Sequence, residues 1–327
     1  MNRRDTKSRL IVLSLLLALA VSLAATRARS IRTAWQMSHS RPDNSETIRL
    51  HVRSLCEEGY RYRVEGKYDR SDLALRQALR IGEASFGPED IEVASVLNQL
   101  GMLDKYAGRF DEGERAYRRA LAILERAYGP DDPRLADIYH NLGGLAHARG
   151  RYEKGEPLAR RGLEMRERAL GPDDRDVAAD VAALAAILDG EGKRDEAERL
   201  YLRALDVFER EAGPDSYDVA VNLNNLGALY QAEGKAGEAE QRFVRALEIK
   251  EKLLGPDHPE VATTLNNLAL LRKSQDRPAE AEALYRRALS IFERALDPSH
   301  PSVVACRENL ARLLKGRHDV RGRQNNR

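Results

Sequence analysis

Cysteine and aromatic residues are scarce in this sequence. The chain of 327 residues has 2 cysteines and 1 tryptophan, and aromatic residues make up 6% of it. Two cysteines give neither a disulfide framework nor the ligand spacing of a structural metal site. The scarcity of aromatic and β-branched residues also argues against a β-sheet. The composition therefore favours a helical protein without disulfides or a structural metal.

Motifs for catalysis are also missing, because no glycine-rich phosphate loop or metal-binding motif occurs. His140 and His147 lie two helical turns apart, ~10.5 Å, and cannot share a zinc ion with ligands near ~2 Å unless a partner bridges them. The paired carboxylates Asp131-Asp132 and Asp173-Asp174 fall in a recurring turn, where helix capping is the expected role. We therefore predict no enzymatic activity and no cofactor or metal.

A fixed period dominates what the sequence does contain. The dipeptide Gly-Pro recurs every 42 residues, and Asp297-Pro298 closes the series. The five dipeptides are Gly87-Pro88, Gly129-Pro130, Gly171-Pro172, Gly213-Pro214 and Gly255-Pro256. A period in this range is typical of a stacked repeat array, in which each repeat contacts its neighbours.

Each repeat predicts two amphipathic helices joined by a tight turn. In residues 218–256, apolar side chains recur at helical spacing on both sides of Gly234, a residue type that ends helices. Small residues recur in register opposite large ones, such as Gly227 with Phe243, as in closely packed helices. We predict an all-α superhelical solenoid of about six antiparallel helix pairs, followed by one capping helix over about 302–315.

The repeat resembles the tetratricopeptide repeat. Its first helix carries L-x-x-L-G-x-x-Y from Leu223 to Tyr230, and its second carries A-x-x-x-F-x-x-A from Ala239 to Ala246. The 42-residue length, the L-N-N-L core and the loop L-G-P-D-H-P over 254–259 resemble the kinesin-light-chain type. The resemblance covers about residues 46–315 and implies a binding scaffold. It is more specific for fold than for function, because one fold carries many unrelated sites.

The two ends of the chain differ from the repeats. Four basic residues within 1–9 precede an apolar run from Leu10 to Ala25, so residues 1–25 are predicted to be an export signal of bacterial type. The alternative is an uncleaved membrane anchor, although the run is only ~24 Å long as a helix. The expected location is exported (periplasmic or extracellular) or membrane-anchored. Residues 26–45 are predicted to be a polar linker, and 316–327 a basic disordered tail.

Charge is distributed unevenly along the chain. The formal net charge is +2, but lysine and arginine predominate in residues 1–35 and 315–327, so the repeats between them carry an acidic excess. An acidic body argues against a phosphate backbone as its main partner. We predict no nucleic acid bound through the solenoid, and a possible membrane tether through the N-terminal segment.

Asparagine recurs on the first helix of the pairs, the helix that lines the concave groove of such a superhelix. It is a mediocre helix former, but its carboxamide offers a donor and an acceptor that match a peptide backbone amide. The ladder is therefore predicted to hold an extended chain with little regard for its sequence. The resemblance to kinesin-light-chain repeats assigns peptide contacts to Asn224, Asn225, Asn266 and Asn267, and in part to Asn98, Asn141 and Asn309.

Ala182 and Ala183 interrupt this ladder. Farther along the first helices, Lys105, Gln231 and Lys273 are predicted to select an acidic or polar ligand. The predicted function is a scaffold that binds a protein or peptide in the groove. One alternative is a structural or assembly protein that uses its convex face or its ends, with the asparagines serving helix stacking. Another is an accessory module of an enzyme system whose catalytic part lies in a partner.

Overall fold

The computed structural model describes the backbone of residues 44–325 and the side chains of residues 45–316. The chain divides into two units, Met1–His51 and Val52–Arg327. In the first unit only the beginning of helix α2 is described. The predicted leader over 1–25 and nearly all of the predicted linker over 26–45 lie outside the described residues.

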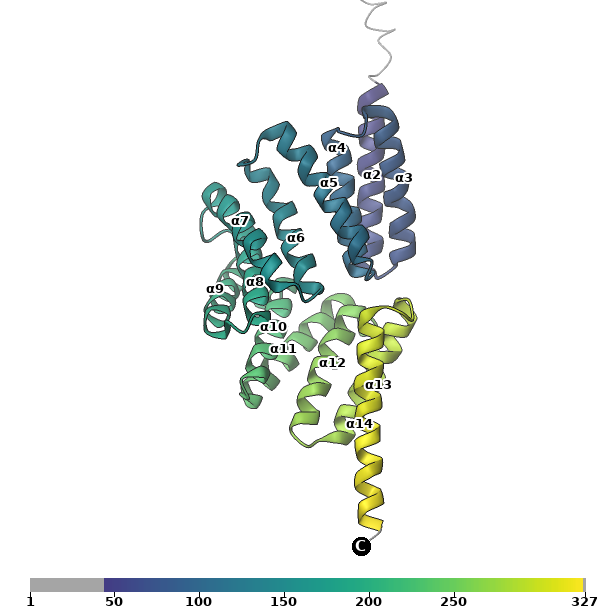
Figure 1. The fold of residues 1–327 in the computed structure, drawn as a ribbon, viewed down its shortest axis with the longest axis vertical. Coiled ribbons are helices and arrows are strands. Elements are labelled where there is room, and N and C mark those ends of the chain that lie inside the picture. Colours follow the sequence, from purple (N-terminus) through teal and green to yellow (C-terminus); the bar gives the residue numbers. More distant parts are fainter. Residues whose placement is uncertain (1–43, 326–327) are drawn as a thin grey trace, which may run out of the picture. The chain divides into compact units, whose positions relative to one another are not determined.

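Every regular element between residues 44 and 325 is a helix. Six helix pairs are followed by a single last helix, which confirms the predicted all-α solenoid (Figure 1). The helices are α2 (Asn44–Val64), α3 (Tyr68–Phe86), α4 (Ile91–Tyr106), α5 (Phe110–Tyr128), α6 (Ala136–Ala148, after the 3-10 turn η1, Pro133–Leu135), α7 (Tyr152–Leu170), α8 (Arg175–Gly190), α9 (Arg194–Ala212), α10 (Tyr217–Ala232), α11 (Ala236–Leu254), α12 (Pro259–Ser274), α13 (Pro278–Ala295) and α14 (Pro301–Asn325).

The loops between repeats begin and end the helices as the sequence predicts. Asp132 accepts a hydrogen bond from the backbone N–H of Arg134 at 3.0 Å, and Asp174 accepts one from Asp176 at 2.8 Å, so both carboxylates are N-caps. At the other end of the pair, Gly129 follows α5 with φ of 90°, a conformation that L side chains rarely adopt. The paired carboxylates of these turns are therefore structural, as expected.

The helices of a pair interlock through the small and large residues that the sequence places in register. A Cβ atom added at Gly101 of α4 would lie 2.6 Å from the ring of Tyr117 of α5, and one at Gly227 of α10 would lie 2.8 Å from Phe243 of α11. Both aromatic side chains are fully buried. The absence of a side chain on the first helix is thus what lets the second helix pack against it.

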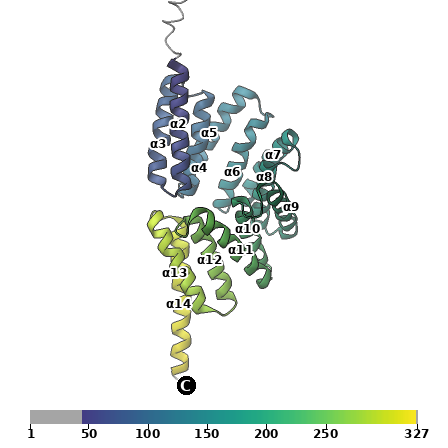
Figure 2. The same cartoon turned by 180° about the vertical axis from the view of Figure 1, so that it is seen from behind.

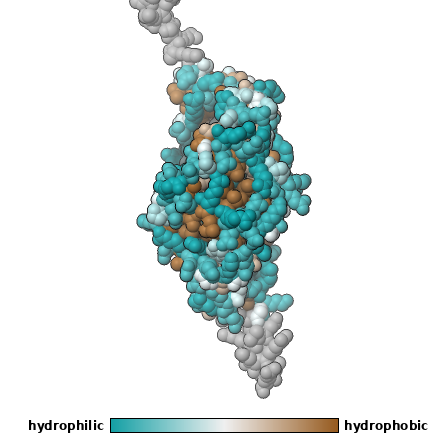
Figure 3. Space-filling view, turned by 90° about the vertical axis from the view of Figure 1, so that its left-hand side faces the viewer, coloured by the Kyte–Doolittle hydropathy of each residue, from teal (hydrophilic) through white to brown (hydrophobic). Residues whose placement is uncertain are grey.

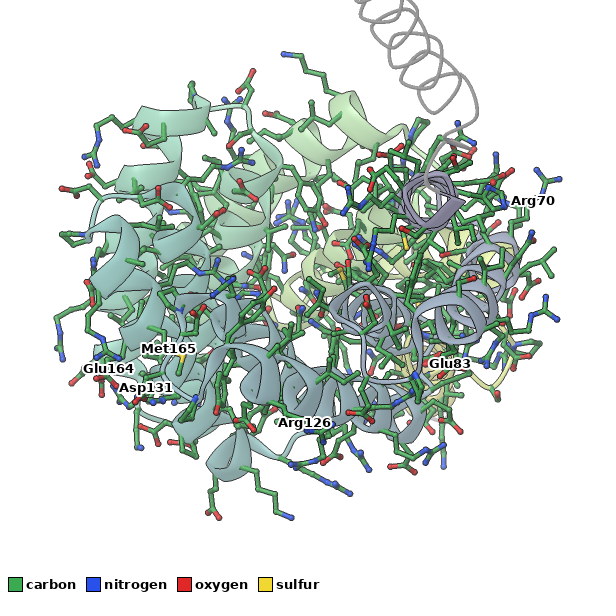
Figure 4. All side chains as sticks on the ribbon, turned by 90° about the horizontal axis from the view of Figure 1, so that it is seen from above. Arg70, Glu83, Arg126, Asp131, Glu164 and Met165 are labelled. Carbon is green, nitrogen blue, oxygen red and sulfur yellow. The ribbon has the colours of Figure 1, made fainter. Side chains whose placement is uncertain are left out.

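A second series of contacts ties neighbouring repeats together on the outer surface. One arginine in each of several second helices donates a hydrogen bond to the proline carbonyl of the preceding Gly-Pro loop. These pairs are Arg119 to Pro88, Arg161 to Pro130, Arg203 to Pro172 and Arg287 to Pro256. Figure 4 shows other charged side chains of this outer rim, including Arg126, Asp131 and Glu164, with Met165 inside them. These arginines therefore connect the second helix of one repeat to the loop before that repeat.

Within the unit Val52–Arg327, the stacked pairs wind until late helices lie beside early ones (Figures 1 and 2). His258, which precedes α12, makes a hydrogen bond of 2.6 Å between its Nε2 and the carbonyl oxygen of Val64 at the end of α2. His300, which precedes α14, makes the same bond of 2.9 Å with Tyr106 at the end of α4. One turn of the superhelix is thereby joined to the next.

The predicted location of the protein must be corrected. In the part of the chain that the structure describes, no helix has both the length and the apolar character needed to cross a membrane. The apolar run from Leu10 to Ala25 is not among the described residues. The described residues therefore show no anchoring segment.

The last helix differs from its predicted extent. The sequence places its end near Lys315, whereas α14 continues to Asn325. α14 is in register with the first helices, most of which end at a tight turn with a glycine, such as Gly108, Gly150 and Gly234. In the repeat of α14 this position is His318, and arginine and glutamine are good helix formers. A single glycine is therefore not enough to end the helix here.

Candidate functional site: the concave groove

The predicted asparagines lie on α4, α6, α10, α12 and α14, and most of them bond to one another. In each bonded pair, the Nδ2 of an asparagine donates to the Oδ1 of an asparagine in a preceding repeat. The pairs are Asn141 to Asn98 at 2.8 Å, Asn267 to Asn224 at 3.3 Å and Asn309 to Asn266 at 3.3 Å. These three bonds join first helices of successive repeats, which is the stacking role that the alternative interpretation expects.

The pairing leaves part of each carboxamide available. A carboxamide has two N–H donors and an oxygen with two lone pairs, and one bond uses only one of them. Asn98, Asn141, Asn266 and Asn267 are half-buried, so their remaining groups are reachable from the groove, whereas Asn224 is 7% exposed. Stacking and ligand contact are therefore compatible in the half-buried asparagines.

The ladder is interrupted at α8, where Ala182 and Ala183 replace the two asparagines. In the other pairs the acceptor lies 43 residues before the donor. The acceptor for Asn225 of α10 would therefore be at residue 182, and the side chain of Ala182 has no polar atom. The side chain of Asn225 has no hydrogen bond to any other described residue. The interruption therefore leaves one predicted ligand-binding carboxamide without a structural role.

A pocket of about 270 Å³ opens at this interruption, and we call it the α8 pocket. Four alanines of α8 form its apolar wall, and α4, α6 and α10 contribute most of its polar groups. The lining residues are Lys105, Tyr106, His140, Gly144, His147, Ala179, Ala182, Ala183, Ala186, Phe208, Tyr217, Asp218, Val221, Asn222 and Asn225. Of the predicted site residues, the structure brings Lys105 and Asn225 together here.

Lys105 is the cation of the α8 pocket. Burial lowers its pKa below the ordinary value, an effect opposed by the charge of Glu260 and reinforced by that of Arg63. Among the described residues Lys105 has no ion pair, and its Nζ lies 5.9 Å from the centre of the Tyr106 ring. A Cβ atom added at Gly144 would lie 3.0 Å from the same Nζ, so the missing side chain of Gly144 makes room for the ammonium group.

The two histidines of α6 take different parts in the pocket. His140 Nδ1 lies 2.6 Å from Asp180 Oδ1, and Arg166 donates to the other carboxylate oxygen at 2.7 Å, so His140 belongs to a buried polar cluster. Burial and the nearby charge of Lys105 lower the pKa of His147 to about 4. At neutral pH His147 is therefore a neutral imidazole, and the pocket lining also includes Lys105 and Asp218.

Asn222 was not singled out by the sequence, although it also lines the pocket. Its Nδ2 donates to the carbonyl oxygen of Tyr201 at 2.7 Å, while its buried Oδ1 has no partner among the described residues. His147 was considered only as a metal ligand, although the 42-residue period places it in register with Lys105. A comparison of polar residues 42 positions apart on the first helices identifies His147 from Lys105. The same comparison does not identify Asn222 Oδ1 as an acceptor without a partner.

Gln231 and Lys273 occupy the same register on α10 and α12, but neither lines the α8 pocket. Gln231 is half-buried and Lys273 is exposed. Lys250 of α11 is buried and is paired with Glu260 at 2.9 Å. The three residues predicted to select a ligand are therefore not brought together, and of the three Lys105 alone lines the α8 pocket.

The geometry defines a helical-repeat solenoid with a polar concave surface. The model of the tetratricopeptide repeat matches five overlapping segments, 92–168, 135–210, 177–252, 218–294 and 260–320. The chain belongs to the tetratricopeptide-repeat family, as the sequence predicted. A search of curated proteins gives no match.

Several solved structures resemble the chain. A Rap protein complexed with Competence and Sporulation Factor has a TM-score of 0.57 and 18% identity, covering 82% of this chain and 76% of that one. BtubC (BKLC) from P. vanneervenii has a TM-score of 0.49 and 26% identity, covering 76% and 91%. A putative kinesin light chain of Podosopora anserina has a TM-score of 0.46 and 18% identity, covering 63% and 98%.

Proposed function

We propose that this protein is a non-catalytic interaction scaffold that holds an extended segment of a partner protein in its concave groove. The observation that carries the proposal is the row of half-buried carboxamides, each with hydrogen-bonding capacity left after pairing. An extended backbone presents N–H and C=O groups that such carboxamides match. Similarity in fold to a Rap protein solved in complex with Competence and Sporulation Factor is consistent with this use of the solenoid.

The cross-turn bonds constrain how a partner would enter. His258 and His300 join one superhelical turn to the next. A segment can therefore reach the groove there either along the superhelix axis or after the two turns have separated. A flexible terminus or an unfolded segment can do this, whereas a folded domain cannot. The proposed partner is therefore a protein with an extended end or linker.

The alternative is a structural or assembly protein whose asparagines serve stacking alone. The three asparagine pairs favour it, and so does exposed apolar surface on the side of α7 and α9, where Figure 3 shows brown patches on a mostly hydrophilic face. Leu170 of α7 and Leu202 of α9 are exposed side chains. In this reading the partner would contact the convex side.

Two asparagine variants separate these functions. Asn225→Ala removes a carboxamide without a protein partner, so we expect unchanged melting and weaker capture of the partner. Asn267→Ala removes a ladder bond and is expected to lower stability by about 1 kcal/mol. The measurement is a crosslinking pull-down with the full chain, with captured proteins identified by mass spectrometry and melting followed by circular dichroism. Equal capture by wild type and Asn225→Ala, with a stability loss confined to Asn267→Ala, would favour the stacking alternative.

A further inference from the structure

The amine of Lys105 lies against a cavity and has no carboxylate as an ion-pair partner. Lys105 is half-buried and lines the α8 pocket, and no described residue forms an ion pair with it. A Cβ atom added at Gly144 of α6 would lie 3.0 Å from Lys105 Nζ, so the amine is directed toward α6. Lys250 of α11, by contrast, is buried and pairs with Glu260 at 2.9 Å. Lys105 therefore has an open space where the buried Lys250 has a carboxylate.

The surroundings of Lys105 disfavour its charged form. Burial lowers the pKa of Lys105, the negative charge of Glu260 opposes this shift, and the positive charge of Arg63 reinforces it. The carboxylate of Asp218 also lines the pocket, but it accepts a hydrogen bond from Arg175 at 2.7 Å. At neutral pH the free amine is therefore a larger fraction of Lys105 than of an exposed lysine. The titratable or charged residues around Lys105 are Arg63 of α2, Tyr106 of α4, His140 and His147 of α6, Tyr217 and Asp218 of α10, and Glu260 of α12.

We propose that Lys105 is a nucleophilic amine that captures a small aldehyde or ketone in the α8 pocket as an imine. The lone pair of Nζ forms the bond to the carbonyl carbon, and a carbon–nitrogen double bond replaces the carbon–oxygen double bond. The two protons of the free amine leave with the carbonyl oxygen as water, so the step needs no oxidant, reductant or further reactant. Addition of water reverses the reaction and returns the amine and the carbonyl compound.

The lining of the pocket limits the carbonyl compound. The four alanines of α8, which replace the asparagine ladder there, form an apolar wall that suits a short hydrocarbon group. A volume of about 270 Å³ is small, since sites for drug-sized molecules begin near ~300 Å³. A branched chain of a few carbon atoms therefore fits the pocket better than a fused aromatic ring does.

One buried acceptor of the same pocket suits the intermediate of this reaction. Asn222 Oδ1 is buried and has no donor among the described residues, although an unpaired buried polar atom is costly. Addition of the amine to a carbonyl group first gives a carbinolamine, whose hydroxyl group is a hydrogen-bond donor. Asn222 therefore supplies an acceptor for that hydroxyl group before water leaves.

Reductive labelling of the full chain measures the reactivity of each lysine. Isobutyraldehyde is added at pH 7 with cyanoborohydride, which reduces an imine to a stable amine, and peptide mass spectrometry gives the labelling rate at each position. Lys273 is the internal reference, because it occupies the equivalent position on α12 and is exposed. We expect Lys105 to be labelled at least about tenfold faster than Lys273, because the free-amine fraction rises about tenfold for each unit by which a pKa is lowered. This advantage should shrink as the pH approaches about 10, where exposed lysines also lose their protons.

A larger aldehyde and two variants test whether the pocket directs the reaction. 2-Naphthaldehyde carries a fused ring and should label Lys105 no faster than Lys273. Ala182→Leu fills the space and should slow the labelling of Lys105 by isobutyraldehyde several-fold, with the rate at Lys273 unchanged. Without reductant, NMR with isotope-labelled isobutyraldehyde should show an imine carbon in the wild type, and Lys105→Arg, which keeps the positive charge, should remove it. Circular dichroism melting verifies that each variant is folded.

Three results would overturn the proposal: labelling of Lys105 no faster than that of Lys273, the same ratio of the two rates with both aldehydes, or an unchanged rate at Lys105 in folded Ala182→Leu. If Ala182→Leu does not fold, the comparison of the two aldehydes on the wild type decides. Partner capture is measured without any carbonyl compound, so the imine site and the proposed scaffold function can fail independently. Fast labelling of Lys105 together with equal partner capture by wild type and Asn225→Ala would support the imine site and count against the scaffold function.

Discussion

His258 and His300 hold one turn of the superhelix against the next, and replacing both with serine should open it. Each ring makes two bonds: Nδ1 accepts from a backbone N–H two residues later, at 3.1 Å, and Nε2 faces a carbonyl of the other turn. Since Nδ1 accepts, Nε2 must carry the proton and donate. Ser216 caps α10 in the equivalent loop, so His258→Ser/His300→Ser retains the caps and removes only the cross-turn bonds.

The magnitude follows from those two bonds. A neutral hydrogen bond contributes about 1 kcal/mol net, so the double variant should lose about 2 kcal/mol of the free energy that holds the turns together. Serine is too short to reach the carbonyls of Val64 and Tyr106. The contacts within and between neighbouring repeats are untouched, and each helix should therefore persist while the superhelix loosens.

Small-angle X-ray scattering and far-UV circular dichroism measure these two effects separately. We expect a larger radius of gyration for the double variant with unchanged helix content, and a lower midpoint in urea. His51→Ser, at an exposed histidine of α2, serves as the control. An unchanged radius of gyration and an unchanged urea midpoint would refute the idea that these bonds close the turn.

Acid should weaken the wild-type protein by another route, because protonation of His300 occurs at Nδ1 and leaves its Nε2 bond to Tyr106 in place. Burial lowers the pKa of His300 below 6.5, while the hydrogen bond to Tyr106 and the charge of Asp297 oppose that shift. A histidine whose pKa is lowered by folding contributes fully above its unfolded pKa, and the contribution is lost as pH falls through the folded pKa. Protonation of Nδ1 would also remove the cap on α14. The urea midpoint of the wild type should therefore fall as pH falls below about 6.5, and the serine variant should show a smaller pH dependence.

Three further substitutions test the packing and the charges. Gly101→Ala should destabilise the protein by about 1–3 kcal/mol because its Cβ would lie 2.6 Å from Tyr117, whereas Gly237→Ala, with nothing within 4 Å, should be neutral or stabilising in thermal melts. Lys250→Met should lower the free energy of unfolding in urea by about 3–5 kcal/mol, because it leaves Glu260 without its ion-pair partner. The double variant Lys250→Met/Glu260→Gln should recover most of that loss. Folding lowers the pKa of His147 to about 4, so the free energy of unfolding of the wild type should fall by up to about 3 kcal/mol between pH 6.5 and pH 4. The His147→Gln variant should lose less over the same range, and an equal loss would count against the lowered pKa.

The helix pairs, their boundaries and their packing could be predicted because they depend on local sequence and on neighbouring repeats. Gly227 and Phe243 recur in register, and Asp174 stands where a cap is needed, so the pattern specifies both the turn and the contact across it. The extent of α14 could not be predicted in the same way, because the glycine turn that ends most of the first helices does not recur after it.

The candidate site was predicted only in part. The sequence identified the asparagines and Lys105 as polar groups of the groove, but a carboxamide at a given position is equally suited to a ligand and to a neighbouring helix. Only the distances between repeats showed that Asn267 bonds to Asn224 while Asn225 does not bond to a neighbour. The empty acceptor of Asn222 depends on where its other atoms bond, which no spacing reveals.

The sequence by itself determined the repeat, the all-helical class and the order of helix pairs, since these arise from periods of a few residues and of 42 residues. The tertiary structure decided how far the array winds before it meets itself. That depends on small rotations between successive repeats, which accumulate along the chain until His258 reaches Val64 and His300 reaches Tyr106, 194 residues away in each case. No local pattern encodes this sum, and so the contact between successive turns could be seen only in three dimensions.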